Sequence, residues 1–320
     1  MTQARYVHIV DEVPELGPAS TSAADSAPDS APGAASDRGP VLVVALAGFL
    51  DAGNAAALTV AHLSGGGAGR VVASFDVDEF YDYRARRPPL TFHEDRYTDY
   101  DTPRLVVRLH TDARGSSYLL LAGPEPDMRW EAFARGVRAV VEHFGVRLVV
   151  SLGSVPMAVP HTRPVQVTNH ATAKRLLVQE NPWKGQIRIP SSAQALTEVR
   201  LGEWGHDAVG FVAHIPHYVA QLDYPQAALA LLEGLEEVSG LVWDHATLRT
   251  AGDARQVEIA TQIADSDEVR SVVQGLEQQY DAFHSAGTNL LAEDEPLPSG
   301  EELGAQFEQF LARLDHPEED

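Results

Sequence analysis

Strand-length apolar runs alternate with amphipathic segments over residues 41–250, and this alternation constrains the fold more than any other feature. Residues 41–47 are wholly apolar, which is typical of a strand buried on both faces of a sheet, and 146–152 and 208–214 are expected to be strands as well. Residues 128–144 and 225–235 carry their apolar side chains at helical spacing. Repeated alternation of this kind favours an α/β domain with three layers, a sheet between two layers of helices.

The first part of this domain predicts a strand, a helix and a second strand. Asp51 stands where the N-cap of a helix over 55–63 belongs, the glycines at 65–67 end that helix, and 71–75 is another short apolar run. This order is typical of a crossover unit that joins two parallel strands of one sheet.

Composition divides the rest of the chain. Residues 16–39 are almost wholly Ala, Ser, Pro, Asp and Gly, which bury too little apolar area to offset the entropy lost on ordering. Apolar residues after 251 fall only at helical spacing. We therefore expect an edge strand within 1–13, a disordered insertion over 14–40, an α/β core domain over 41–250, a helical region over 251–314 and an acidic tail over 315–320.

Charge and residue usage exclude several classes of function. The 320 residues include no cysteine, so disulfides, thiolate metal sites and a cysteine nucleophile are excluded. With 46 acidic and 24 basic residues the net charge is -22, and no basic cluster exists that would neutralise nucleic-acid phosphates. The first residues lack the pattern of an export signal, and no stretch approaches the roughly 20 apolar residues of a membrane span. We expect a cytoplasmic protein that binds neither nucleic acid nor membrane.

The turn Gly48-Phe49-Leu50-Asp51-Ala52-Gly53 lies between a strand and a helix, where α/β proteins often bind phosphates. Asn54 and Ala55 stand where a phosphate loop has Lys and Ser or Thr, and the carboxylate of Asp51 would repel an anion. A capped turn is the favoured interpretation.

Residues 76–83 place four carboxylates and three aromatic rings within eight positions. Acid/base catalysis, a bound divalent cation and an interface with aromatic anchors all remain open, as does a solvated loop that covers the edge of the sheet. No second carboxylate cluster completes a metal site, so no metal is assigned.

Two histidine segments follow later strands. His161 and Arg163 lie between prolines where the carboxyl end of a strand is expected, a position suited to polarising a substrate, although a loop histidine more often bonds to the backbone. His214 and His217 are separated by Pro216, which prevents the regular helix that a metal-binding pair would need. No Gly-x-Ser-x-Gly motif is present.

Several of these segments together resemble the family of proteasome assembly chaperones typified by the second eukaryotic chaperone, in its actinobacterial form. The matching stretches, in chain order, are residues 41–57, Asp76 to Tyr83 with Arg87-Pro88, Gly123 to Trp130, Leu152-Gly153 through Pro160-His161-Thr162-Arg163-Pro164-Val165, Ile215-Pro216-His217-Tyr218, Glu268 to Asp281 and 297–311.

The resemblance implies an α/β/α fold related to phosphorylases and peptidyl hydrolases, with a helical extension at the C-terminal end and no established catalysis. It also implies self-association into small rings or dimers, a trimer being one option, and proteasome subunits as partners. Some relatives bind proteasomes through a C-terminal hydrophobic-Tyr-X tail, whereas this sequence ends Pro317-Glu318-Glu319-Asp320.

Two classes of function are consistent with these observations. The first is a non-enzymatic, self-associating protein-binding factor without a cofactor, whose expected interface residues are Phe80, Tyr81, Tyr83, His161, Thr162, Arg163, His217 and Tyr218. The alternative is a hydrolase or phosphorylase acting on a small metabolite at the carboxyl end of the sheet, and its expected catalytic residues are Asp51, Glu79, His161, Arg163 and His217. If residues 76–83 form the contact, alanine at Phe80 and Tyr81 should abolish association without changing the melting temperature.

Overall fold

The structure is a computed structural model that describes residues 5–16, 39–65, 67–179, 181, 186–264 and 266–289. Most of the insertion expected over 14–40, and all of 290–320 with the end of the predicted helical region and the acidic tail, lie outside the described residues. Within the insertion, Pro14–Leu16 form a short 3-10 turn. The chain divides into two units, residues 1–276 and 277–320, and the strands that the structure describes all belong to the first unit.

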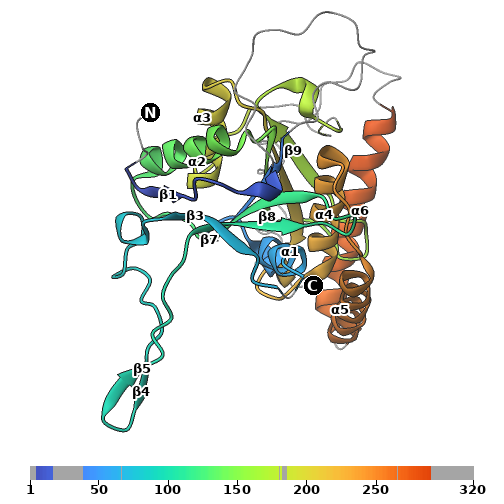
Figure 1. Ribbon diagram of the computed structural model, residues 1–320. Helices are drawn as coiled ribbons and strands as arrows, with labels where there is room; N and C mark the ends of the chain where they lie inside the picture. Colours follow the sequence, from blue (N-terminus) through green and yellow to red (C-terminus); the bar gives the residue numbers. More distant parts are fainter. Residues whose placement is uncertain are drawn as a thin grey trace, which may run out of the picture. The chain divides into compact units, whose positions relative to one another are not determined.

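An eight-stranded sheet forms the middle of the first unit (Figure 1). Its strands, in spatial order, are β1 (Val7–Ile9), β3 (Arg70–Phe75), β6 (Val106–Thr111), β7 (Ser117–Pro124), β2 (Val41–Ala47), β8 (Leu148–Met157), β10 (Ala208–Pro216) and β9 (Val167–Ala171). The four strands β7, β2, β8 and β10 are parallel, and the strands outside them pair antiparallel. The strongest apolar runs of the sequence therefore occupy the centre of the sheet, where both faces are covered.

Helices cover both faces of this sheet. On one face lie α2 (Trp130–Phe144) and α3 (Ala193–Glu203), whose apolar residues share one core cluster with β3, β6 and β7. On the other face lie α1 (Ala55–Leu63), α4 (Pro225–Ser239) and α5 (Ala246–Ala264), which share a second cluster. The prediction of a three-layer α/β/α sandwich is confirmed. The helix α6 (Asp267–Asn289) begins in the first unit and ends in the second, which confirms helices in the C-terminal region.

The strand order differs from the expectation for residues 41–75. Although β2 and β3 run in the same direction, β6 and β7 lie between them in the sheet. The reason is that the β6–β7 hairpin supplies the neighbour of β2, with Leu42 opposite Leu119. The first strand, helix and strand are thus present, but they do not form a crossover between adjacent strands.

The two edges of the sheet are closed in different ways. A three-residue strand, β1, pairs with β3 in the segment where a weak edge strand was expected. At the opposite edge, Asn181 accepts a hydrogen bond from the amide of Asn169 at 3.2 Å and donates one to its carbonyl at 2.8 Å. The amide group of Gln179 donates to the carbonyl of Val167. Side-chain amides thus satisfy the β9 edge, which limits pairing with another chain.

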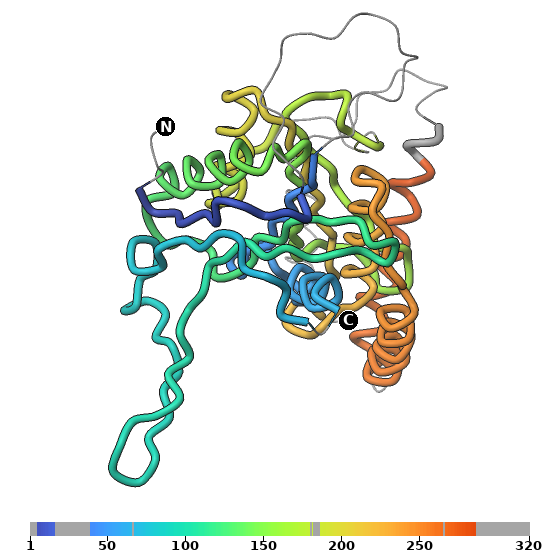
Figure 2. The backbone as a smooth tube through the Cα atoms, viewed as in Figure 1, coloured from blue at the N-terminus to red at the C-terminus, as the bar shows by residue number. Residues whose placement is uncertain are grey.

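Residues 84–104, which we call the hairpin arm, leave the sheet after β3 and return to it at β6 (Figure 2). The strands β4 (Thr91–His93) and β5 (Arg96–Thr98) pair at its tip and form a separate two-stranded sheet. Phe92 and Tyr97 pack on each other there with ring centroids 5.2 Å apart, yet they are 62% and 71% exposed. The arm has no counterpart among the sequence predictions, because its strands are only three residues long.

Candidate functional site

The turn of residues 48–53 is a helix cap. The carboxylate of Asp51 accepts hydrogen bonds from the amides of Ala56 at 2.7 Å and Ala57 at 3.3 Å, which are the first unpaired donors of α1. Burial raises the pKa of Asp51, while these two hydrogen bonds act in the opposite direction. Because a carboxylate already holds the amides that a phosphate would use, the turn does not offer an anion site.

Phe80 is a core residue, and the expectation that it faces a partner is wrong. Its side chain is 1% exposed, and its ring lies 5.9 to 6.2 Å, centroid to centroid, from those of Tyr6, Phe75 and Phe133. The 3-10 turn Val77–Glu79 directs the next side chain inward, beneath β1. Alanine at Phe80 would therefore disturb the core and cannot serve as a neutral test of an interface.

The carboxylates of the same segment are taken up by separate partners. Glu79 forms an ion pair with Arg129, and Asp78 accepts a 2.6 Å hydrogen bond from the hydroxyl of Tyr83, which raises the pKa of Tyr83 to about 12. The carboxylate of Asp82 accepts hydrogen bonds from the backbone amides of Arg84 at 2.8 Å and Ala85 at 3.3 Å. Charges dispersed in this way do not form a cation site, and no group of three or more metal-binding side chains exists within the described residues.

Tyr81 and Tyr83 remain half-buried at the base of the hairpin arm. Their rings meet edge to face at 5.0 Å, and the guanidinium of Arg86 lies 4.6 Å from the ring centre of Tyr81. Arg86 is itself held by a 2.6 Å ion pair with Asp127. The base of the arm is thus a fixed aromatic and cationic surface.

His161, His217 and Tyr218 come together beyond the carboxyl ends of β8 and β10. The hydroxyl of Tyr218 lies 2.8 Å from both the backbone nitrogen and the Nδ1 of His161. Gln256 of α5 donates to the carbonyl of His161 at 2.9 Å, and the ring of His217 packs edge-on against Tyr218. His161 is only 5% exposed, so its main role within these contacts is to anchor the loop.

The remaining predicted residues of this loop, Thr162 and Arg163, contact each other at 3.4 Å. Thr162 and His217 are exposed, and Arg163 is half-buried. Asp51 and Glu79, which were expected to join His161 in an enzyme, instead cap a helix and pair with Arg129. The structure therefore brings together the histidines and the tyrosine of this end of the sheet, whereas the two carboxylates have other partners.

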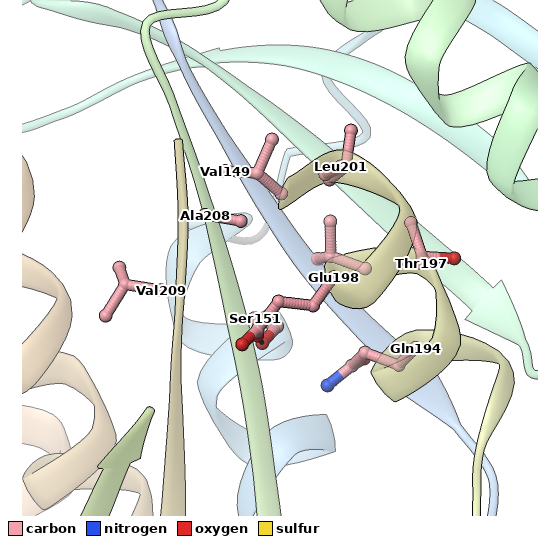
Figure 3. A pocket seen from close by; sticks show the side chains of 9 residues that line it. Val149, Ser151, Gln194, Thr197, Glu198, Leu201, Ala208 and Val209 are labelled. Atoms are coloured by element: carbon pink, nitrogen blue, oxygen red, sulfur yellow. Dashed lines mark hydrogen bonds between the residues drawn. The ribbon is translucent and has the colours of Figure 1, made fainter. Parts of the chain in front are cut away.

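A second polar cluster, absent from the sequence predictions, lies between the sheet and α3. The carboxylate of Glu198 lies 2.8 Å from Nδ1 of His170 and 3.5 Å from Oγ of Ser151. Figure 3 shows the side chains of Ser151 and Glu198 pointing toward each other from β8 and α3. The adjoining cavity is about 10 Å³, room for one water molecule. No local motif signals this cluster, since its members come from three elements.

The chain belongs to the PAC2 family, whose family model matches residues 45–263. The matched residues include most of the three-layer sandwich. They also include His161, His217 and Tyr218 at the carboxyl ends of the central strands. The resemblance inferred from the sequence is thereby confirmed.

Solved structures of relatives agree with this assignment. Rv2714 of Mycobacterium tuberculosis, a protein of unknown function, is 42% identical with a TM-score of 0.78, covering 90% of this chain and 92% of that chain. A Corynebacterium glutamicum protein of unknown function is 33% identical with a TM-score of 0.76, covering 88% and 100%. Rv2125 of M. tuberculosis, described as a proteasome-assembly chaperone homologue, is 30% identical with a TM-score of 0.65, covering 73% and 99%.

Two searches gave no match, one among curated proteins and one among the described helices of this chain. No curated protein is similar enough to this chain to count as a match. Among the helices that the structure describes, none combines the length and the apolar character needed to cross a membrane.

Proposed function

We propose that this chain is a self-associating protein-binding factor with a chaperone-like role in assembly. The observation that carries the proposal is the hairpin arm, which presents the exposed rings of Phe92 and Tyr97 away from the sheet. Membership of the PAC2 family supports a role of this kind.

The arm has the properties of a contact element. A lone two-stranded hairpin is marginally stable in water, and β4 and β5 pair only with each other. Its aromatic side chains leave most of their area in solvent, together with Leu90 and Tyr100, both 48% exposed. Tyrosine and phenylalanine are enriched at the centres of interfaces because they bury much area at a low cost in side-chain entropy. A partner surface that covers these rings would stabilise the arm.

The base of the arm extends the proposed contact surface. Tyr81 and Tyr83 are half-buried, Tyr81 against Arg86 and Tyr83 against Tyr81 and Asp78, so they lose little freedom on binding. A second candidate surface lies at the carboxyl ends of the central strands. It consists of Thr162, Arg163, His217, Tyr218 and the edge of His161.

The first expected partner is a second copy of the chain, because the arm carries no internal core of its own. Proteasome subunits are the proposed client, on the ground that a relative 30% identical over 73% of this chain is described as a homologue of a proteasome-assembly chaperone.

Size measurement tests self-association. Light scattering at micromolar concentration should give a mass above the 34.6 kDa of one chain. The double variant Phe92→Ser with Tyr97→Ser should shift this mass toward one chain and leave the melting temperature unchanged, since neither ring contributes to a core. Phe49→Ser is the matched control, because Phe49 is 64% exposed on a different loop. A monomeric wild type, or a double variant that assembles normally, would contradict the proposal.

Affinity purification from the native host tests the client. The tagged wild type should retain proteasome α- or β-subunits identified by mass spectrometry, and the arm variant should retain less. Recovery of the tagged chain alone would contradict the proposed client while leaving self-association intact.

A further inference from the structure

We propose that Ser151, His170 and Glu198 form a hydrolytic site that cleaves esters of small acyl groups, distinct from the hairpin arm and from the loop of His161. The inference begins with the register of three neighbouring strands. Gly210 of β10 lies opposite Ser151 of β8 on one side and opposite His170 of β9 on the other. Side chains of such a row point to the same face of the sheet, here the face that α3 covers.

Gly210 is what allows the serine and the histidine to approach. A Cβ at this position would lie 2.5 Å from Oγ of Ser151 and 2.6 Å from Nε2 of His170. Oγ of Ser151 and Nε2 of His170 therefore both lie close to the space that a Cβ of residue 210 would fill. Any residue larger than glycine at this position would push them apart. In ligand-free structures the bond between a nucleophile and its base is often long, and it tightens when substrate binds.

Glu198 orients the histidine. Its Oε1 lies 2.8 Å from Nδ1 of His170, which directs Nε2 away from the carboxylate, and its Oε2 lies 3.5 Å from Oγ of Ser151. A serine, a histidine and a carboxylate bonded to the far ring nitrogen are the groups that activate serine nucleophiles on many unrelated folds, and in the proposed reaction the hydroxyl of Ser151 turns from Glu198 to Nε2 of His170. Here Ser151 and His170 are the proposed catalytic residues, and Glu198 is a positioning residue.

Access limits the size of the substrate. The side chain of His170 is 42% exposed and that of Glu198 is 15% exposed, while Ser151 as a residue is 7% exposed. The cluster thus opens to solvent on the histidine side and narrows toward the serine. The adjoining cavity is lined mainly by aliphatic side chains, with room for little more than a methyl group. The methyl end of an acetyl group is of this size, and a longer acyl chain is not.

The chemistry balances without a cofactor. Oγ of Ser151 attacks the ester carbonyl while its proton passes to Nε2 of His170. The bond to the alcohol then breaks, and the leaving oxygen takes that proton. Water attacks the acyl-serine by the same route in reverse, releasing the carboxylic acid and restoring the hydroxyl.

Covalent labelling tests the site directly. A fluorophosphonate probe should add to the full-length protein once, and peptide mapping should place the adduct on Ser151. The protein should also hydrolyse p-nitrophenyl acetate faster than p-nitrophenyl octanoate. Ser151→Ala should abolish both reactions, whereas Ser191→Ala, which changes an exposed serine outside the cluster, should leave them unchanged. A probe that labels another residue, or none, would overturn the proposal.

The histidine and the glutamate have their own readouts. His170→Gln should lower the labelling rate by about 100-fold or more, the usual contribution of a general base. Glu198→Gln should lower the labelling rate by less than His170→Gln does, because it removes only the acceptor that orients the ring, and Glu198→Asp should restore part of the lost rate. Equal labelling of wild type and His170→Gln, with both folded by thermal melting, would show that no base acts here. Each of these results is independent of the oligomeric state.

Discussion

The ring of Phe80 contacts three other aromatic rings and is shielded from solvent, although it lies in a segment rich in acidic residues. A segment that combines carboxylates and aromatics suggests an exposed, adhesive loop. The short 3-10 turn before Phe80 overturns that interpretation, because it rotates one ring inward and leaves Tyr81 and Tyr83 at the surface.

We predict that Phe80→Ala destabilises the protein by about 3–5 kcal/mol, the range for deleting a buried aromatic side chain. Urea unfolding followed by circular dichroism measures this difference. Phe92→Ala is the control, because a 62% exposed ring outside any core should change stability by no more than about 0.5 kcal/mol. Equal midpoints for Phe80→Ala and wild type would show that the ring does not stabilise the fold.

At the scale of elements, α1 depends on a side chain that precedes the helix by several positions. The helix begins at Ala55 with Asn54 in the left-handed region, and Asn54 makes no side-chain cap of its own. Asp51 supplies the cap from within the preceding turn, where Gly53 at φ 65° permits the chain to bend back. A Cβ at Gly53 would also lie 2.9 Å from Cβ of Tyr224, so close packing requires the glycine as well.

Replacing this cap should weaken the fold by a modest amount. Asp51→Ala is expected to cost about 0.5–2 kcal/mol, as for other helix caps, measured by urea unfolding. Asp51→Asn keeps one acceptor oxygen and removes the charge whose burial is unfavourable, so it should lose less than the alanine variant. An alanine variant as stable as the wild type would mean that water replaces the carboxylate at no cost.

The strand β9 and the helix α3 are examples of elements that the local pattern of apolar residues does not predict. β9 has the sequence Val-Thr-Asn-His-Ala, with too little apolar character to indicate a strand, and it exists because β10 pairs with it on one side and amide side chains satisfy it on the other. The helix α3 buries Ala193, Thr197 and Leu201 on one face, a stripe too narrow to stand out in the sequence.

At the scale of the whole molecule, two histidines whose pKa values are lowered in the folded protein link stability to pH. Burial lowers the pKa of His214, whose Nε2 lies 2.9 Å from the hydroxyl of Thr168, and burial followed by the nearby charge of Arg108 lowers the pKa of His110. A histidine whose folded pKa is below its ordinary value of 6.5 binds fewer protons folded than unfolded. Its contribution to stability is therefore complete above pH 6.5 and is lost as the pH falls below that value.

We expect the free energy of unfolding to fall between about pH 7.5 and about pH 5.5, measured by urea titration at constant ionic strength. His214→Gln removes one of the two groups and should reduce the size of this fall. The difference between wild type and variant in the slope of unfolding free energy against pH gives the contribution of His214, because the net charge of -22 affects both proteins alike. Parallel slopes would show that His214 titrates normally in the folded protein.

The sequence by itself determined the class of fold, since the spacing of apolar residues can be recognised in each short stretch of chain without knowing which segments pack against it. It placed β2, α1, α2, β10 and α4 within a few residues, and its motifs identified the family. Only the tertiary structure decided the order of the strands, the burial of Phe80 and the partners of Asp51 and Glu79, which are the amides of α1 and Arg129. The tertiary structure also decided that Ser151 contacts Glu198, which is 47 positions away in the chain. Each of these depends on which distant segments pack together, and packing is settled by the free energy of the whole core rather than by any single stretch of chain.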